Sequence, residues 1–235
     1  MSHRLKIAGI FVAVIAAALV GGPWVYINFI REPAAESFLD EASTSTIATS
    51  DTTVNSSAPT ISLDDPSGTW QVSNTSQVGY RVDEVLFGQN VTAVGRTNAV
   101  TGSLVIDDGV VTSGQFVVDM TTVKSDEPKR DAQFESRIMD VINYPTATFV
   151  LTSPITLASN ATASSTTNTA SGELTLRGTT KPISISVIGE VRDGRIVVTG
   201  ETTVTFGEWG IPNPSIPGIS TEDFGILEFQ LVLER

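Results

Sequence analysis

Apolar side chains alternate with polar ones along most of the chain after Thr69. A period of two is typical of β-strands with one buried face, because successive side chains point to opposite sides of a strand. The alternating positions are Val78, Tyr80 and Val82; Leu104 and Ile106; Phe116, Val118 and Met120; Ile183, Ile185 and Val187; Ile196, Val198, Val204 and Phe206; and Leu227, Phe229, Leu231 and Leu233. The pattern predicts an all-β domain.

Two Asp-Gly dipeptides separate neighbouring stretches of this pattern. Asp108-Gly109 follows Ile106, and Asp193-Gly194 precedes Ile196. This dipeptide suits the two central positions of a tight hairpin turn. Roughly seven or eight strands joined mostly by short turns predict an antiparallel barrel or a sandwich, and a parallel α/β sheet does not fit.

One segment has helical spacing instead. Its apolar residues recur at intervals of three and four, at Phe134, Ile138, Val141 and Ile142. Acidic residues and Pro128 precede it, which suits the start of a helix. Pro145 follows, and the residue before a proline does not easily stay helical. We therefore expect one short helix that ends at Tyr144-Pro145.

A long apolar run occupies residues 7–30, with Asn28 as its only strongly polar side chain. At 1.5 Å per residue it is long enough to cross a membrane. A cleavable signal peptide is the alternative, since Ala16, Ala17 and Ala18 are small, but the run continues well past them. Arg4 and Lys6 precede the run, so the positive-inside rule predicts a cytoplasmic N-terminus and an extracytoplasmic domain at the cell membrane.

Two further stretches lack periodicity. Residues 32–68 are rich in Ser, Thr, Ala and acidic side chains, and we expect a disordered tether there. Residues 158–171 are rich in Ser, Thr, Asn and Ala and predict a solvent-exposed loop. The expected organisation is a cytoplasmic tip and transmembrane anchor in 1–31, a tether in 32–68 and a β domain in 69–235.

Composition excludes several kinds of chemistry. There is no cysteine, and His3, which precedes the apolar run, is the only histidine. The exported domain therefore lacks the residues of common nucleophile pairs and zinc sites. Adjacent carboxylates such as Asp83-Glu84 point to opposite faces of a strand, which argues against a glycosidase. We expect no enzyme, no metal and no cofactor. The net charge of −12 disfavours nucleic acid as a partner.

Four stretches carry a resemblance to a known family: VLFGQNVTAVGRT from Val85, SDEPKRDAQFESRIMDVINYPTATF from Ser125, GELTLRGTTKP from Gly172 and FGEWGIPNPSIPG from Phe206. With these, the region from Thr69 to Arg235 resembles the YceI-like family of lipid- or polyisoprenoid-binding proteins, and more closely its membrane-anchored actinobacterial members. Gln133 stands where many members have histidine. The resemblance implies an extended, lipocalin-like antiparallel barrel whose apolar interior holds a long-chain lipid such as a polyprenyl quinone or phosphate.

Apolar positions within the stretches of resemblance are the candidate ligand-binding residues. They are Phe87, Phe116, Phe134, Ile138, Phe149, Leu176, Phe206 and Trp209. The same residues could instead fill a solid barrel. Arg130 and Asp131 could contact a polar lipid head, or could pair with each other or cap the helix. We expect a turn at Arg177-Gly178.

Two functions are compatible with these observations. The chain is either a lipid-binding protein, or a structural or protein-interaction domain of the cell envelope with a solid barrel. Its oligomeric state does not follow from the sequence.

Overall fold

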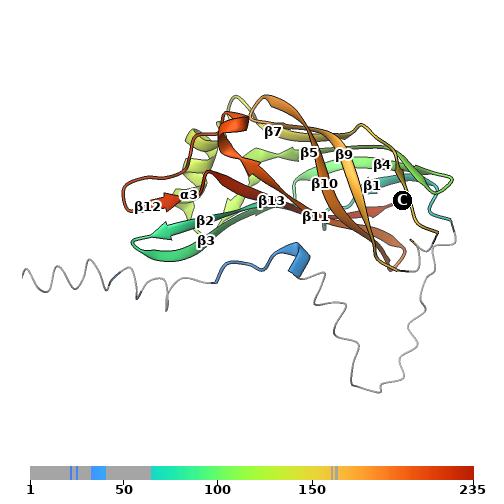
Figure 1. Ribbon diagram of the computed structural model, residues 1–235, viewed down its shortest axis with the longest axis horizontal. Helices are drawn as coiled ribbons and strands as arrows, with labels where there is room; N and C mark the ends of the chain where they lie inside the picture. Colours follow the sequence, from blue (N-terminus) through green and yellow to red (C-terminus); the bar gives the residue numbers. More distant parts are fainter. Residues whose placement is uncertain (1–21, 23–24, 26–32, 41–64, 160, 162–163) are drawn as a thin grey trace, which may run out of the picture.

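The strands of the described residues form one sheet in which all neighbours pair antiparallel. The structure is a computed structural model and describes residues 22, 25, 33–40, 65–159, 161 and 164–235 (Figure 1). The strands are β1 (Gly68–Val72), β2 (Gln77–Leu86), β3 (Gln89–Thr97), β4 (Val100–Asp107), β5 (Val110–Asp119), β6 (Lys124–Ser125), β7 (Thr146–Leu151), β8 (Ile155–Thr156), β9 (Thr166–Leu176), β10 (Thr179–Arg192), β11 (Arg195–Thr205), β12 (Ile219–Thr221) and β13 (Phe224–Glu234).

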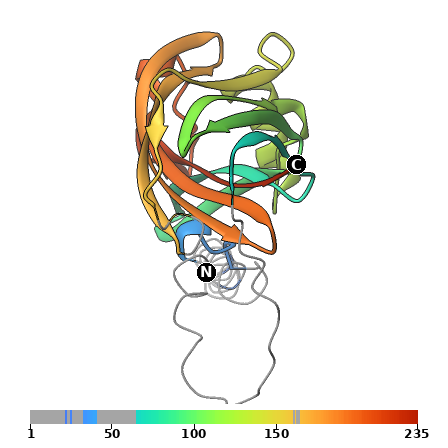
Figure 2. The same cartoon turned by 90° about the vertical axis from the view of Figure 1, so that its right-hand side faces the viewer.

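Eight of these strands close into a barrel. Their order is β1-β4-β5-β7-β9-β10-β11-β13, and β1 returns to β13 through the pairs Gln71 with Glu234 and Val72 with Leu233. Figure 2 shows the strands curving around a common axis. The predicted all-β antiparallel barrel is confirmed, and the sandwich alternative is wrong.

Strand β13 has two partners along one edge. Its C-terminal end pairs with β1, whereas residues Ile226–Gln230 pair with β2. Between the two, the buried Ser76 hydroxyl donates to the Val232 carbonyl at 3.1 Å and accepts from the Val232 amide at 2.9 Å. Strand β2 then runs on past the start of β13 and forms a hairpin with β3. The turn of this hairpin and the β4–β5 turn therefore lie at opposite ends of the barrel, which we name the β2–β3 end and the β4–β5 end.

In four hairpins, the two strands are joined by a tight turn whose two central residues have left-handed backbone conformation. Both central residues have positive φ at Phe87-Gly88, Asp108-Gly109, Arg177-Gly178 and Asp193-Gly194. Turns of this kind match the twist of the strands that they connect. The turns expected at the two Asp-Gly dipeptides and at Arg177-Gly178 are confirmed.

The helix forms at the β2–β3 end, but it is shorter than expected. Helix α3 (Pro128–Gln133) begins with Pro128, and the side chain of Glu127 caps it by accepting from the Lys129 amide at 3.2 Å. The chain continues as one π-helical stretch, η3 (Phe134–Ile138), before turning. Tyr144-Pro145 therefore does not end the helix, and Ile142 is exposed. Two 3₁₀ turns, η2 (Met120–Thr122) and η4 (Phe206–Trp209), complete the elements.

The expected loop at 158–171 is only partly correct. Strand β9 begins at Thr166, and its first residues, from Thr166 opposite Gly189 to Ser171 opposite Ser184, pair with the second half of β10. Threonines have a high preference for strands, and backbone pairing with β10 outweighs the missing apolar alternation. The polar tract therefore contributes a barrel strand.

The predicted membrane span at 7–30 lies outside the described residues, apart from Gly22 and Val25. Among the helices of the described part, none has the length and apolar character needed to cross a membrane. The tether residues 41–64 also lie outside the description. Residues 33–40, however, pack against the outside of the sheet below β2 and β3 (Figure 1), with Phe38 only 2% exposed. That packing departs from the expected disordered tether.

Candidate ligand-binding cavity

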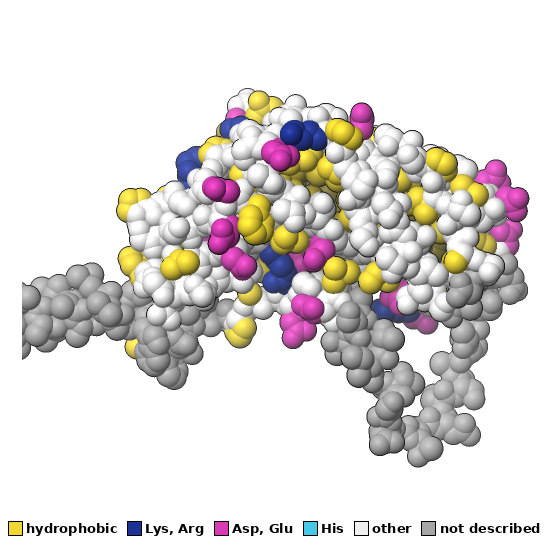
Figure 3. Space-filling model, viewed as in Figure 1, with side chains coloured by type: hydrophobic (Ala, Val, Ile, Leu, Met, Phe, Trp, Pro, Cys, Tyr) yellow, Lys and Arg dark blue, Asp and Glu magenta, His cyan; other side chains and the backbone are white. Residues whose placement is uncertain are grey.

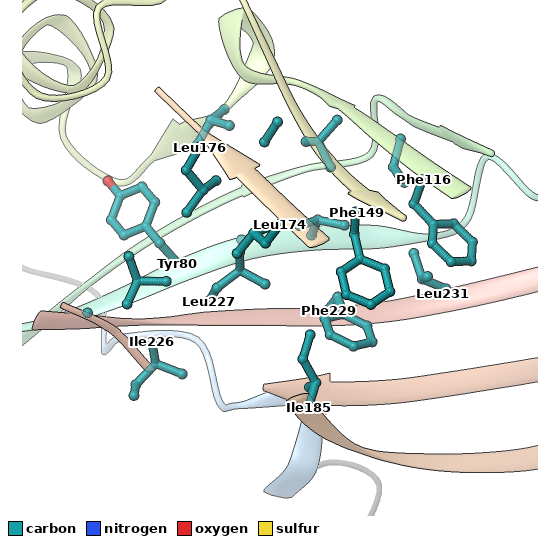
Figure 4. A pocket seen from close by; sticks show the side chains of 18 of the residues that line it. Tyr80, Phe116, Phe149, Leu174, Leu176, Ile185, Ile226, Leu227, Phe229 and Leu231 are labelled. Carbon is teal, nitrogen blue, oxygen red and sulfur yellow. The ribbon is translucent and has the colours of Figure 1, made fainter. Parts of the chain in front are cut away.

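The barrel encloses a cavity of about 690 Å³ that runs through its length. Inward-facing side chains of nearly every barrel strand line it, and most of them are aliphatic or aromatic. Figure 4 shows side chains from different strands, such as Leu174, Leu227, Phe149 and Phe229, projecting into the same space. The interior of the barrel is therefore hollow rather than solid.

Most of the residues predicted from the sequence lie around this cavity. Those that line it are Phe87, Phe116, Phe134, Ile138, Phe149, Leu176 and Phe206, together with Arg130. They come from the β2–β3 turn, strands β5, β7 and β9, the helical segment and η4. Their contact with a ligand stays a prediction.

Trp209 and Asp131 are not among the lining residues. Trp209 is buried in the hydrophobic cluster at the helix, and the Lys181 ammonium lies 5.9 Å from its ring centroid. Asp131 accepts from the amide and hydroxyl of Ser125 at 2.8 and 2.7 Å. This carboxylate therefore fixes the loop before the helix instead of pairing with Arg130.

Glycines let aromatic rings lie flat on the neighbouring strand. A Cβ built on Gly172 of β9 would come within 2.4 Å of the Phe149 ring, and one on Gly95 of β3 within 2.4 Å of the Tyr80 ring. Such approaches are closer than any real Cβ contact. These two glycines therefore set the positions of the rings that shape the cavity wall.

The β2–β3 end of the cavity carries most of its charged groups, whereas Glu190, Asn168 and Thr166 line it toward the other end. Tyr80 stacks on Phe134, with 5.2 Å between the ring centroids and 12° between the planes. Burial raises the pKa of Tyr80, so its phenol stays protonated at neutral pH and can donate a hydrogen bond. In Figure 4 the Tyr80 hydroxyl lies at one end of the cavity and Phe116 at the other.

Arg130 is held at this end by two carboxylates. It pairs with Glu84 at 3.5 Å and with Asp126 four residues earlier. Burial opposes its charge, but Glu84 and Asp126 outweigh that cost and raise the pKa of the guanidinium. Glu84, Asp126, Glu127, Lys129 and Arg130 all line the cavity, so the charges at its polar end sum to slightly negative rather than positive.

Strands β10 and β11 are not paired along their whole length, which leaves a gap in the wall of the barrel. These strands pair only from Ser186 with Glu201 to Arg192 with Arg195, so their halves nearer the β2–β3 end separate. Figure 3 shows hydrophobic side chains inside a recess on this face. Lys181 of β10 and Glu208 of η4 form an ion pair of 3.5 Å between the separated segments. The separated strands therefore form a recess in the side of the barrel, in addition to the end of the cavity at Phe87.

Several lining residues were missed in the sequence. Tyr80, Leu174, Ile185, Leu227 and Phe229 line the cavity beside the predicted residues. Their alternation was visible in the sequence, but alternation does not distinguish a side chain that lines a cavity from one that fills a core. Glu84 was not predicted as a site residue for another reason. Its partner Arg130 is distant in sequence, so no local pattern indicates that the two side chains pair.

The described residues hold no cluster of three or more His, Asp or Glu side chains that could bind a metal ion. The polar groups of the cavity are two cations, four carboxylates, the amides of Gln133 and Asn168, two threonine hydroxyls and the Tyr80 phenol, within a largely apolar wall. This arrangement suits the binding of an amphiphile with a long apolar part and a small polar head.

Comparisons with known proteins agree with this architecture. Residues 70–233 match the family model described as the YceI-like domain. The crystal structure of Burkholderia cenocepacia BcnA is 18% identical with a TM-score of 0.55, and the match covers 68% of this chain and 98% of that one. A polyisoprenoid binding domain from Saccharophagus degradans, implicated in plant cell wall breakdown, is 14% identical with a TM-score of 0.56, over 71% and 97%. Curated proteins gave no significant match.

Proposed function

Because the chain belongs to the YceI-like domain family, we propose that it is a membrane-anchored, extracytoplasmic protein that binds a polyisoprenoid or a similar long-chain lipid in its barrel. Binding rather than catalysis is the activity that this site supports. The apolar cavity is the observation that carries the proposal. Its volume of about 690 Å³ lies within the usual range of roughly 300–1,000 Å³ for ligand sites.

The two ends of the cavity differ in their charged groups, and we base the direction of the ligand on this difference. Tyr80 and Arg130 supply polar contacts at the β2–β3 end, whereas Phe116, Phe229 and Leu231 form an apolar wall further along (Figure 4). We place the polar head beside Tyr80 and the hydrocarbon chain toward the rings. The structural neighbour from Saccharophagus degradans, described as polyisoprenoid binding, supports this class of ligand.

The charges near Tyr80 favour an uncharged head. Arg130 is already engaged by Glu84 and Asp126, and Glu127 adds a third carboxylate to the lining. A phosphate would have to displace these carboxylates or lie among like charges. A quinone or a hydroxyl head can instead accept from the Tyr80 phenol without adding charge.

The ligand is tested by purifying the full-length protein in mild detergent and identifying co-extracted lipids by mass spectrometry. We expect a stoichiometric lipid with a long apolar chain, and preferential reloading by a polyprenyl quinone or a polyprenol over a polyprenyl phosphate. A protein that purifies without lipid and does not take up any of the three would support the alternative of a structural or protein-interaction domain of the cell envelope.

The anchor and the location rest on the sequence of residues 1–31. Alkaline carbonate washing of membranes should leave the protein in the membrane fraction, because the apolar run at 7–30 is long enough to span. Protease added to cells without their wall should degrade the barrel domain. Release by carbonate would contradict the anchor, and protection from protease would contradict the orientation.

A further inference from the structure

Residues 33–40 occupy a defined site on the outside of the barrel. The ring of Phe38, 2% exposed, lies under the guanidinium of Arg96 at 3.9 Å from the ring centroid. Arg96 also donates to the carbonyl of Glu36, and Arg81 donates to the carbonyl of Ala35. An aromatic ring and two backbone carbonyls thus meet two cations of the sheet.

A carboxylate of the sheet also holds these two cations. Glu228, 1% exposed, accepts from Arg81 Nε at 2.8 Å and from Arg96 Nε at 3.0 Å. The three residues come from the adjacent strands β13, β2 and β3. Because the buried carboxylate fixes both guanidinium groups, the site loses little side-chain entropy when residues 33–40 dock.

The direction of the docked segment follows from the strand register. Arg96 is opposite Gly79, two residues before Arg81 on β2. In the docked segment, Ala35 contacts Arg81 and the later Phe38 contacts Arg96. From its N-terminal to its C-terminal side, the segment therefore runs away from the β2–β3 turn. Pro33 and Ala34, which precede Ala35, therefore lie on the side of that turn.

Exposed apolar side chains gather at the β2–β3 end, and we name them the apolar lip: Val85 of β2, Phe87 of the turn and Ile216 of the loop before β12. Phe87 is 62% exposed, and the other two are also exposed. Phe87 is held by its left-handed backbone, with φ of 47°, and by an amide hydrogen bond of 3.0 Å to the Gly218 carbonyl. Phe87 and Ile216 also line the cavity, so the apolar lip is part of its rim.

The lip lies within reach of the predicted membrane span. Ala35, which is docked, lies five positions after Ile30, where the apolar run ends, and these five steps span at most about 18 Å of extended chain. Phe87 lies six residues beyond Arg81 along β2, or roughly 20 Å. Pro33 and Ala34 lie on the same side of Ala35 as the lip, so a chain of this length allows the lip and the end of the span to meet at one membrane surface.

We propose that the docked residues 33–40 orient the barrel so that the apolar lip contacts the lipid bilayer, with the rim of the cavity at the membrane surface. This inference rests on the proposed anchor and lipid-binding function. A bilayer is the partner that fits, because the lip is apolar, continuous with an apolar cavity, and tied by a short segment to a membrane span. Lipid can then pass between bilayer and cavity without crossing water.

The absence of cysteine allows a direct test in the full-length protein reconstituted in nanodiscs of phosphatidylcholine and phosphatidylglycerol. A single Val85→Cys, which leaves the cavity lining intact, carries an environment-sensitive fluorophore, and Ser113→Cys near the β4–β5 turn is the matched position at the opposite end. We expect blue-shifted emission at position 85, quenched by lipids spin-labelled near the headgroup, and water-like emission at position 113.

A second change separates orientation from simple tethering. Phe38→Ala in the Val85→Cys background removes the docked ring while leaving Arg81, Arg96 and Glu228 in place, and it should shift the emission toward that of water. Val150→Ala, which removes an exposed apolar side chain on β7, away from the docked segment and the lip, is the control and should have no effect. Water-like emission at position 85 in the parent, or no response to Phe38→Ala, would overturn the inference.

Mass spectrometry of lipid bound in the same samples keeps the two proposals distinct. If the lip does not contact the bilayer but the barrel still carries stoichiometric lipid, the orientation is wrong and the proposed function stands. If the lip contacts the bilayer but no lipid is bound, the proposed function is wrong.

Discussion

The ring of Phe134 lies nearly parallel to the ring of Tyr80, with 5.2 Å between the centroids. The pair joins the helical segment to strand β2 at the polar end of the cavity. Phe134 is buried, whereas the Tyr80 hydroxyl marks the point at which the apolar wall gives way to Arg130 and its carboxylates. The stack thus fixes the Tyr80 hydroxyl, a hydrogen-bond donor, at the boundary between the apolar wall of the cavity and its charged end.

Removing only the Tyr80 hydroxyl should weaken binding of a quinone or polyprenol. Tyr80→Phe keeps the ring stack, and the affinity should fall roughly three- to tenfold, since one net hydrogen bond contributes about 0.5–1.5 kcal/mol. Titration calorimetry or displacement of a fluorescent lipid measures the change. Tyr144→Phe, outside the cavity lining, is the matched control. Equal affinities for Tyr80→Phe and the parent protein would exclude this contact.

Alkaline pH should destabilise the fold through the same residue. Burial raises the pKa of Tyr80 in the folded state above its unfolded value of roughly 10. The unfolded chain therefore loses its phenolic proton first, and this contribution to stability, complete below about pH 10, declines as pH rises further. Urea unfolding between neutral pH and pH 11 should show a steeper loss in the parent than in Tyr80→Phe. Parallel curves for the two proteins would contradict the expected linkage.

Glu228 should contribute strongly to stability. Glu228→Ala leaves Arg81 and Arg96 without their buried partner, and loss of one member of a buried ion pair costs about 3–5 kcal/mol. Denaturant unfolding measures this cost. Glu234→Ala breaks a half-exposed pair of 3.6 Å with Arg195 and should cost no more than about 1 kcal/mol. Similar losses in the two variants would mean that Glu228 is less important than its burial indicates.

Filling the cavity should abolish lipid binding without unfolding the barrel. Ala170 of β9 lines the cavity, so Ala170→Phe places a ring in space that the ligand needs. The co-purified lipid should fall to a small fraction of that in the parent, with a stability change of no more than about 1–3 kcal/mol. Thr169→Phe, next to it on the outer face, is the control and should keep its lipid. Undiminished lipid in folded Ala170→Phe would place the ligand elsewhere.

Local sequence patterns predicted much of the fold. The period of two in residues such as Leu227 and Phe229 identified a strand, and the Asp-Gly dipeptides identified turns, because both signals depend on backbone geometry within a few residues. The same alternation brought Phe116, Phe149 and Leu176 into the candidate site. It did not reveal that the barrel is hollow, since this depends on how side chains from distant strands fill a shared volume.

Long-range pairing explains what was missed. Glu228 sits among alternating apolar residues on the outer face of β13, where a carboxylate is normally solvated. It is buried because Arg81 and Arg96 cover it together with residues 33–40. Phe38 lies in a polar tract and gives no periodic signal, so its docking becomes evident only from the position of Arg96.

Strand β13 pairs with β11, β1 and β2, and it is the last strand in chain order. Strands β1 and β2 therefore cannot complete their pairing, and the sheet cannot close, until β13 is available. Pairings between such distant parts of a chain form slowly. During synthesis the earlier strands stay without this shared partner, so the polypeptide remains open until β13 has been made. For the export that we propose, such late closure would keep the chain unfolded while it passes through a translocation channel.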